Sequence, residues 1–457
     1  MQLFITKRKN CNNKSMFDHR VLKHAMISII SLIIFSAIFF LIHVDTIIQH
    51  DDDSLHHPSS SSSSSSKGII PQKSKESQTE IKLEAGVVRS TTTLTVSHIA
   101  LNSLQEGNHR EVEIMDNDDD EERGNTLLVA PINVSESERI SWFRGKMHEF
   151  KILKSDKLAR EFHGRVLGFF GNNNGCEGQF FMTWISPATS FGSRELLSVQ
   201  SVFKVHPKAC LVILSRSLDS VRGYRVLKPV LDLGFKVQAI TPDLSFLFKG
   251  TPAEYWFHQL RKGKKDPGEI PLFQNLSNLI RLSVLYKYGG VYLDTDFILL
   301  KPFTGLRNCI GAQSMDLGQK HWTRLNNAVL VFDMNHPLLL RFIKEFALTF
   351  DGNKWGHNGP YLVSRVVSKL GRKSGFNFTI LPPMAFYPVD WNKIDGLFRK
   401  PKTRSESKWV EAKLVQLTGE SYGVHLWNKQ SGRLVIEEGS ILGKLVSHHC
   451  VICKTLL

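Results

Sequence analysis

The segment 275–303, NLSNLIRLSVLYKYGGVYLDTDFILLKPF, constrains the fold more than any other part of this chain. Leucines recur at helical spacing in its first half, and Gly289 and Gly290 follow where a helix can end through a residue of positive φ. Residues 291–293 then begin a short apolar strand. A helix that turns directly into a buried strand is typical of an α/β domain, in which helices cover a sheet.

The residues before this segment alternate between apolar strands and amphipathic helices. Strands are predicted at 179–185, 209–214 and 236–240, and helices at 195–203 and 221–231. This alternation predicts a Rossmann-like, largely parallel sheet with helices on both faces, in which ligands bind beyond the carboxyl ends of the strands. Neither G-x-G-x-x-G nor G-x-x-x-x-G-K-[ST] follows these strands, which excludes the dinucleotide and P-loop modes of binding phosphate.

Two acidic residues, Asp294 and Asp296, lie at the end of the strand that begins at 291. Paired carboxylates at the ligand edge of a parallel sheet are suited to Mn²⁺ or Mg²⁺, which can neutralise the charge of a departing diphosphate. Such pairs are also common in solvated loops, but burial beside an apolar strand is costly without a cation or hydrogen bonds. A phosphatase of the haloacid-dehalogenase type is the alternative. It requires Thr or Val where Ile298 stands and places the motif on its first strand, whereas three predicted strands come first here.

The N-terminal part carries an apolar run from 25 to 42, which the next two residues extend. At about 1.5 Å per residue, such a helix nearly crosses a hydrocarbon core of about 30 Å. Basic residues dominate before the run and aspartates follow it, so the positive-inside rule places the N-terminus in the cytosol. We therefore predict a cytosolic tail at 1–24 and a transmembrane anchor at 25–44, with a cleaved signal peptide as the alternative.

Residues 45–140 have the composition of a flexible lumenal stem. They include a serine run at 59–66 and an acidic cluster at 116–122, and they cannot bury enough apolar surface to offset the entropy of ordering. The remaining domain, 141–457, holds 44 Lys and Arg residues against 24 Asp and Glu residues. Its lumenal placement excludes a nucleic acid as partner. The positive charge therefore favours an anionic small molecule such as a nucleoside diphosphate, or an acidic glycan, with a solvated basic surface as the alternative.

The cysteines and the glycosylation sequons fit a domain of the secretory pathway. Cys450 and Cys453 form a C-x-x-C pair without a second one, so a structural disulfide or free thiols are favoured over zinc or redox chemistry. Sequons begin at Asn133, Asn275 and Asn377 and predict a glycoprotein. Asn275 lies on the helix before the acid pair, where a glycan would have to face solvent, so we expect this sequon to be unused.

The sequence YKYGGVYLDTD at 286–296 follows a helix that carries Arg281. It resembles the DXD-containing glycosyltransferases, which include α-1,4-galactosyltransferases of the Gb3-synthase type and α-1,4-N-acetylglucosaminyltransferases. The likeness continues in the same order across roughly residues 176–455. Its further segments are LNNAVLVF at 325–332, KWGHNGPYLVSRV at 354–366, LPPMAFYPV at 381–389 and YGVHLWNKQS at 422–431. The resemblance implies a GT-A-type fold, a UDP-sugar donor, transfer with retention of the anomeric configuration, and a single-pass type II Golgi membrane protein with a lumenal catalytic domain.

The resemblance also implies roles for single residues. Asp294 and Asp296 would bind the metal and the donor's ribose or diphosphate, with His425 as a further metal ligand. Trp184 would stack on the uracil ring, and Arg281 would hold the donor's phosphate or sugar. For His425 and Trp184 the alternative is plain packing in the core. For Arg281 the alternative is a surface salt bridge.

The same resemblance assigns further positions around the donor and the acceptor. The implied donor contacts are Asn278, Tyr292 and Trp427. Asn326 and Asn327 would line the donor sugar and would be catalytic together with the two aspartates. His357 and Asn358 would form the acceptor side. Core packing is the alternative for the second tryptophan, and turn formation is the alternative for the His-Asn pair.

One position departs from the family pattern. The family usually has Asp three residues before the arginine, and this chain has Asn278, which can hydrogen-bond sugar hydroxyls but carries no charge. The resemblance predicts a metal-dependent retaining enzyme that moves a hexosyl group, α-linked galactose or N-acetylglucosamine, from a UDP-sugar to a glycan or glycolipid acceptor. A front-face displacement is expected, because no carboxylate stands out as a nucleophile. The alternative is a catalytically silent Golgi protein that binds glycans or acts as a scaffold on the same fold.

Overall fold

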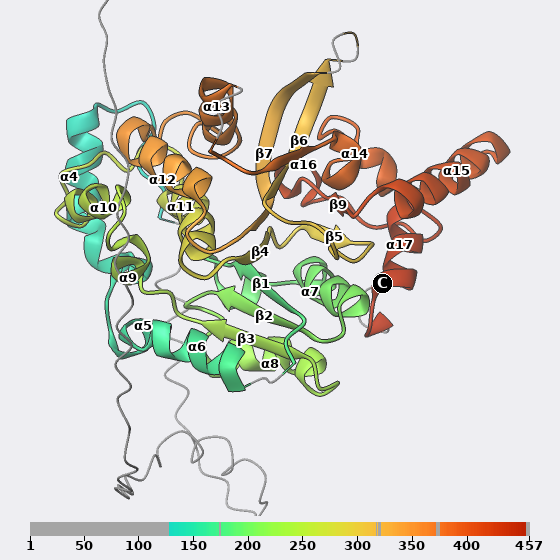
Figure 1. Cartoon of the computed structure of the whole chain (residues 1–457), viewed down its shortest axis with the longest axis horizontal. Helices are drawn as coiled ribbons and strands as arrows, with labels where there is room; N and C mark the ends of the chain where they lie inside the picture. Colours follow the sequence, from blue (N-terminus) through green and yellow to red (C-terminus); the bar gives the residue numbers. More distant parts are fainter. Residues whose placement is uncertain (1–127, 173–174, 317, 319–320, 372–374, 454–457) are drawn as a thin grey trace, which may run out of the picture. The chain divides into compact units, whose positions relative to one another are not determined.

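The central element of the fold is a seven-stranded sheet (Figure 1) with the strand order β3-β2-β1-β4-β7-β6-β8. The computed structural model describes residues 128–172, 175–316, 318, 321–371 and 375–453. The strands of this sheet are β3 (Lys236–Ile240), β2 (Ala209–Leu214), β1 (Gly178–Thr183), β4 (Gly290–Leu293), β7 (His321–Phe332), β6 (Cys309–Asp316) and β8 (Thr379–Leu381). Four neighbouring pairs are parallel and the two pairs that involve β7 are antiparallel, so the sheet is mixed but mostly parallel, as predicted.

The three strands predicted in the first half of the domain are confirmed. β2 and β3 have the predicted bounds, whereas β1 ends at Thr183, two residues before its predicted end. The indole Nε1 of Trp184 donates to the carbonyl of Pro187 at 3.1 Å. The chain therefore already bends towards the turn that follows β1.

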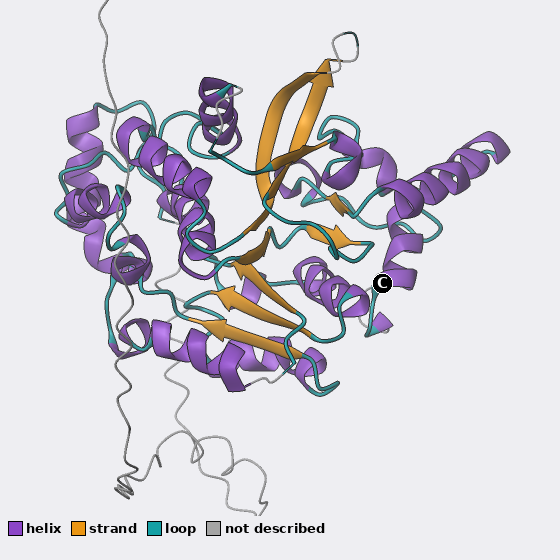
Figure 2. Cartoon of the chain, in the orientation of Figure 1, coloured by secondary structure: helices purple, strands orange, loops and turns teal. Residues whose placement is uncertain are grey.

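Helices cover both faces of this sheet, as the purple helices around the orange strands show (Figure 2). Along β1, Phe181 faces one core cluster, while Phe180 and Met182 face another, as successive residues of a strand do. The first cluster packs α6 (Phe162–Asn172), α11 (Leu272–Tyr288), α12 (Pro337–Thr349) and α13 (Pro360–Leu370) against the sheet, and the second packs α7 (Ser193–Val205) and α8 (Val221–Leu231). The two predicted helices correspond to α7 and α8, and α8 has the predicted bounds.

The turn between α11 and β4 confirms the predicted glycine corner. Gly289 ends α11 with a φ of 67°, and Gly290 follows with a φ of 101°. A side chain at either position would collide with the backbone, because an added Cβ would lie 2.6 Å from the nitrogen of Met334 or from the carbonyl oxygen of Gln179. The corner delivers Asp294 just beyond the end of β4, beside the end of the parallel strand β1.

A second, two-stranded sheet joins the acid pair to the C-terminal part of the chain. β5 (Phe297–Leu299) pairs antiparallel with β9 (Gly423–His425), and the register places Phe297 opposite His425. A third core cluster packs this sheet against α15 (Arg404–Glu420) and α17 (Ile441–His449). Figure 1 shows α15 in red-orange, with one end extending away from the sheet.

The folded domain begins before residue 141. Helix α4 (Glu136–Lys146) starts with a capping box formed by Ser135 and Glu138. Arg139 is 7% exposed, and its Nη2 lies 2.7 Å from Oδ2 of Asp266 in an ion pair. The predicted boundary between stem and catalytic domain at residue 140 therefore falls inside a helix that is bonded to the domain, and the boundary moves upstream.

The other predictions for the N-terminal part concern the tail at 1–24, the anchor at 25–44 and most of the stem. They lie outside the described residues. Within the part of the chain that the structure describes, no helix combines the length and the apolar character needed to span a membrane.

Cys450 and Cys453 form a disulfide, which is one of the two predicted states of this pair, and a second disulfide joins Cys176 to Cys210. Asn275 is 4% exposed, and its Oδ1 accepts a hydrogen bond from the side chain of Asn358 at 2.9 Å. This burial agrees with the expectation that the sequon at 275 is unused in the folded domain.

Candidate functional site

A cavity of 680 Å³ opens beyond the carboxyl ends of β1 and β4, where a ligand is expected in a sheet of this kind. Its walls come from distant parts of the sequence: α11, the strands β6 and β7, the start of α13, and the segment that follows β9. The volume is in the range of small-molecule sites. Both predicted aspartates and the predicted histidine line it.

Asp294 is held by residues of α11 and β4. Nη2 of Arg281 lies 3.0 Å from Oδ1 of Asp294, and Nη1 donates to Oδ2 at 3.1 Å. The hydroxyl of Tyr292 donates to Oδ1 at 3.1 Å. The side chain of Asp294 keeps 25% of its surface exposed. Its carboxylate is therefore held in a fixed orientation and is accessible from the cavity.

Arg281 is buried, and its other donors are used within the protein. Nη1 donates to the carbonyl of Asn327 at 2.8 Å, and Nε donates to the carbonyl of Ser277 at 3.3 Å. The guanidinium also lies over the ring of Tyr292, 4.7 Å from its centroid. Since a buried charge is costly unless it is paired, Arg281 and Asp294 stabilise each other. The structure thus places Arg281 at the cavity as the partner of Asp294 and not as a free fork for phosphate.

Asp296 is held by the C-terminal segment. Its Oδ1 lies 3.2 Å from Nε2 of His425, and the backbone N–H of Asn428 donates to its Oδ2 at 2.8 Å. The N–H of Leu426 donates to the carbonyl of Asp296 at 2.8 Å. Asp296 is 8% exposed and His425 is 7% exposed. The predicted third ligand therefore reaches the acid pair through the pairing of β5 with β9.

Burial and neighbouring charges set the protonation of this group. Burial raises the pKa of Asp294, although the guanidinium of Arg281 acts in the opposite direction. Burial alone would also raise the pKa of Asp296, but the imidazole of His425 and the N–H of Asn428 bring it below its usual value. Burial opposes ionisation of His425, yet the carboxylate of Asp296 raises the pKa of its imidazole. Asp296 and His425 therefore each favour the charged form of the other.

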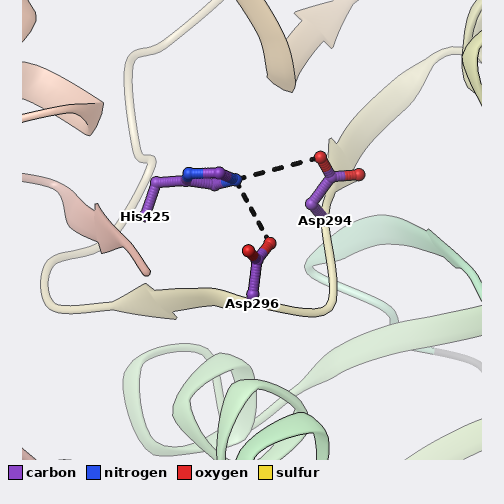
Figure 3. A group of neighbouring side chains, drawn as sticks. All are labelled: Asp294, Asp296 and His425. Carbon is purple, nitrogen blue, oxygen red and sulfur yellow. Dashed lines mark ion pairs between the residues drawn. The ribbon is translucent and has the colours of Figure 1, made fainter. Parts of the chain in front are cut away.

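One ligand atom from each of Asp294, Asp296 and His425 lies within 4.8 Å of the other two. Figure 3 shows the imidazole aimed between the two carboxylates, with Nε2 4.0 Å from Oδ2 of Asp294. Carboxylate oxygens are the ligands that Mn²⁺ and Mg²⁺ prefer, and a neutral imidazole nitrogen is a common ligand of metal ions in proteins. The donor set therefore fits a divalent cation of this kind.

Asparagine side chains link α11 to β7 along the cavity wall. Nδ2 of Asn327 donates to Oδ1 of Asn278 at 2.9 Å, and Nδ2 of Asn278 donates to the carbonyl of Gln274 at 3.2 Å. Nδ2 of Asn326 donates to Oε1 of Gln313 at 3.0 Å. All three asparagines border the cavity, and their contacts with a donor stay a prediction. At the position where the family has Asp, Asn278 donates a hydrogen bond that a carboxylate could not make.

The two tryptophans expected near the donor also border the cavity. The indole of Trp184 is fixed by its bond to Pro187, and Nε1 of Trp427 donates to the carbonyl of Val389 at 2.9 Å. The ring of Trp427 meets the ring of His425 edge to face, with centroids 4.4 Å apart. Trp427 therefore packs against the imidazole and helps to fix its orientation.

His357 and Asn358, predicted on the acceptor side, do not line the cavity. Nε2 of His357 lies 2.8 Å from the carbonyl of Thr349. Asn358 is 2% exposed, and its Nδ2 donates to the carbonyl of Asp351 at 2.8 Å and to Asn275. These bonds fasten the loop between α12 and α13, which agrees with the turn-forming alternative to ligand contact.

Sequence reasoning missed the aromatic residues that line the outer part of the cavity. Trp355, Tyr361 and Trp391 all border it and are exposed. Trp355 and Tyr361 lie in the segment 354–366 that carries part of the resemblance, and their aromatic side chains beside a Gly-Pro turn were an available signal. No comparable signal in the sequence pointed to Trp391. The backbone N–H of Asn428 was also missed, because backbone donors leave no mark in a sequence.

Two family models match the chain. The glycosyltransferase sugar-binding region containing a DXD motif matches residues 192–316, and the alpha 1,4-glycosyltransferase conserved region matches residues 331–457. The first match includes Asp294 and Asp296, and the second includes His425.

Individual proteins are also similar to this chain. Lactosylceramide 4-alpha-galactosyltransferase of Mus musculus is 33% identical over a match that covers 60% of this chain and 74% of that protein. Alpha-1,4-N-acetylglucosaminyltransferase of Homo sapiens is 26% identical, over 55% of this chain and 73% of that protein. An uncharacterized protein of Arabidopsis thaliana is 32% identical over 62% of this chain. That match spans 43% of the Arabidopsis protein, less than half of its length.

Proposed function

This chain belongs to the family of α-1,4-glycosyltransferases with a DXD motif, and from this premise we propose that it transfers a hexosyl group from a UDP-sugar to a glycan or glycolipid acceptor. The proposed sugar is galactose or N-acetylglucosamine in α-linkage, because one relative is named a galactosyltransferase and another an N-acetylglucosaminyltransferase. The proposed fold type is GT-A, which agrees with a mostly parallel sheet whose acid pair lies at a strand end.

The observation that carries this proposal is the convergence of Asp294, Asp296 and His425 in a cavity large enough for a nucleotide sugar. These three side chains would hold Mn²⁺ or Mg²⁺, which when bound supplies positive charge against the charge that grows on the leaving diphosphate. The protein fixes this donor set in advance through Arg281 and the N–H of Asn428, so little reorganisation is needed when the donor binds.

The remaining donor contacts follow from the residues along the cavity wall. Trp184 is proposed to stack on the uracil ring, because its indole is fixed beside the end of β1. Asn326 and Asn327 are proposed to hydrogen-bond the hydroxyls of the donor sugar. Asn278, which accepts from Asn327, would orient that amide.

Transfer is proposed to retain the anomeric configuration through a front-face displacement. Among the described residues that line the cavity, Asp294 and Asp296 are the only carboxylates, and both are engaged by partners. No free carboxylate is therefore available there to form a covalent glycosyl intermediate. The acceptor hydroxyl would form the new C–O bond on the face that UDP leaves, while the bond to the diphosphate breaks. The hydroxyl proton would pass to a diphosphate oxygen.

The proposed location is the Golgi membrane, with the residues 25–44 as a single type II anchor and the catalytic domain in the lumen. The disulfides Cys176–Cys210 and Cys450–Cys453 support an oxidising compartment. Asn133 and Asn377 are exposed, so their sequons are accessible to glycosylation. Protease protection of the catalytic domain in intact microsomes, together with a shift on deglycosylation, would test this location.

The activity is tested with the purified full chain and radiolabelled UDP-galactose and UDP-N-acetylglucosamine in the presence of Mn²⁺. The wild type should release UDP, and Asp296→Asn should lose about 10²- to 10³-fold of the rate. Asp232→Asn is the matched control, because Asp232 forms an exposed pair with Lys228 on α8. Equal rates for Asp296→Asn and wild type would reject the metal role. Binding of UDP without turnover of any donor would favour the silent glycan-binding alternative.

A further inference from the structure

Three exposed aromatic side chains line the same cavity as the acid pair. Trp355, Tyr361 and Trp391 are exposed by 47%, 41% and 44%. Removing aromatic surface from water is energetically favourable. A cluster of aromatic side chains left exposed at a cavity therefore indicates a surface that a ligand covers. By contrast Trp409, which is exposed by 51%, lies on α15 and does not line the cavity. We call this group of three side chains the aromatic rim.

Two rings of the aromatic rim are held in position by cations. Nζ of Lys429 lies 3.2 Å from the centroid of the Trp355 ring, and Cζ of Arg324 lies 4.6 Å from the centroid of the Tyr361 ring. Tyr361 also packs closely on Gly356, where an added Cβ would lie 3.0 Å from the ring. A cation over a ring favours one ring orientation. The aromatic surface is therefore already oriented before a ligand arrives.

The loop that carries Trp355 is fastened to the helix that positions the acid pair. Nδ2 of Asn358 donates to Oδ1 of Asn275 on α11, and Oδ1 of Asn358 accepts from the N–H of Asp351 at 3.2 Å. The same helix carries Arg281, which holds Asp294. α11 thus fixes the loop that carries Trp355 relative to the acid pair, and a fixed distance between two substrates is what transfer between them requires.

The composition of the cavity indicates which kind of molecule the aromatic rim accepts. A pyranose ring has a face of C–H groups that can pack on an aromatic ring, and hydroxyls at its edge that need hydrogen-bond partners. Gln313 and Gln430 border the cavity together with the aromatic rim and can supply such partners. A lipid chain would instead require continuous apolar walls. The mixture of aromatic and amide side chains therefore favours a sugar.

We propose that the aromatic rim is the acceptor subsite, on which the terminal pyranose of a neutral glycan stacks while its hydroxyl faces the donor. The proposal rests on the proposed function for the donor side of the cavity. It differs from the expectation that His357 and Asn358 contact the acceptor, because the side chains of these two residues bond to backbone carbonyls of the same region and do not line the cavity.

The experiment compares the full-length wild type with Trp355→Ala and Trp391→Ala, and uses Trp409→Ala as the matched control. Each protein is saturated with UDP and Mn²⁺, and the affinity for UDP is measured by calorimetry. A pool of neutral oligosaccharides that end in galactose, glucose, N-acetylglucosamine or mannose is then added. Saturation-transfer NMR reports which ring C–H protons contact the protein, and circular dichroism confirms that each variant is folded.

We expect the wild type and Trp409→Ala to saturate the ring C–H protons of at least one oligosaccharide. Each aromatic-rim variant should bind that oligosaccharide about five- to tenfold more weakly, with unchanged affinity for UDP. Binding that is equal in the rim variants and the wild type would overturn the proposal, and so would the absence of any bound oligosaccharide. Failure of the wild type to bind UDP is a separate readout and would contradict the proposed function itself.

Discussion

At the inner end of the cavity, Asp294 and Asp296 each have two or more partners, and the side chains that hold them are buried. In the aromatic rim, Trp355 and Trp391 keep nearly half of their surface exposed. The difference indicates a division of tasks. The charged groups are held by partners that bury them, whereas the proposed recognition of a neutral sugar uses oriented aromatic surface that is left open to the ligand. Substitutions at the acid pair should therefore affect stability and turnover, and substitutions in the rim should affect binding of one substrate.

The largest effect is expected from Arg281→Met, which removes the charge and keeps a long apolar side chain. Asp294 would lose its nearest charged partner and keep the hydrogen bond from Tyr292, so the free energy of unfolding in urea should fall by about 3 kcal/mol. The double variant Arg281→Met/Asp294→Asn should recover part of this loss, because the unpaired charge is gone. Losses that simply add in the double variant would show that the two side chains do not depend on each other.

His425→Gln tests the third ligand without removing the acid pair. Glutamine can still hydrogen-bond Asp296 but is a weaker ligand than imidazole, so the Mn²⁺ concentration for half-maximal UDP binding should rise about 10- to 100-fold. His448→Gln is the matched control, because His448 is an exposed histidine on α17. A metal titration that is the same for wild type and His425→Gln would remove His425 from the metal site.

Asn278→Asp restores the acid that the family usually has at this position. Aspartate can still accept from Asn327, as Asn278 does now, and adds a negative charge that strengthens bonds from sugar hydroxyls. We expect the KM for the UDP-sugar to fall about fivefold, with kcat changed less. A KM that does not change would show that Asn327 shields position 278 from the donor.

The pH dependence of stability should show a contribution from His449, on α17, that is distinct from that of the acid pair. His449, on α17, has a buried Nδ1 without a hydrogen-bond partner, and burial lowers the pKa of its imidazole to about 4 from a usual value of about 6.5. Between these values the unfolded chain binds a proton that the folded chain does not, so the free energy of unfolding should fall as the pH drops from 6.5 towards 4. Above pH 6.5 this residue makes no contribution. Urea titrations of His449→Gln should show a flatter dependence in that window, and an unchanged slope would exclude His449 as its source.

The smallest effect is expected from Trp391→Phe. Phenylalanine keeps an aromatic face at the cavity, so binding of the oligosaccharide identified in the NMR experiment should stay within about twofold of the wild type. The free energy of unfolding should change by less than about 0.5 kcal/mol, because the side chain is exposed. A loss as large as that of Trp391→Ala would mean that the indole is needed for its N–H and not for its face.

The sequence predicts those parts of the fold that depend on one local period. β2, β3 and α8 have the predicted bounds because each is an uninterrupted apolar strand or amphipathic helix. The predicted start of the domain at residue 141 lies inside α4, because the acidic composition of the stem continues into this helix. There Glu136 and Glu138 lie in the first turn, where acids stabilise a helix.

The candidate site was predictable to a different extent at each residue. Asp294 and Asp296 follow from their place at a strand end, whereas His425 depended on the family resemblance, because nothing near it in the sequence shows that β9 pairs with β5. His357 and Asn358 show the reverse problem. Polar residues in a glycine-flanked loop can bind a ligand or fasten the loop, and only the burial of Asn358 distinguishes the two.

The pairing of β5 with β9 has a consequence for biosynthesis. A nascent chain that has not yet reached residue 423 contains the acid pair but cannot present an imidazole to it, nor the N–H of Asn428. The proposed donor site is thus complete only after the segment that contains β9 and Asn428 has been synthesised and β9 has paired with β5. A truncated or half-folded molecule would therefore lack part of the proposed metal site, and full activity in the proposed sugar transfer would require the complete domain.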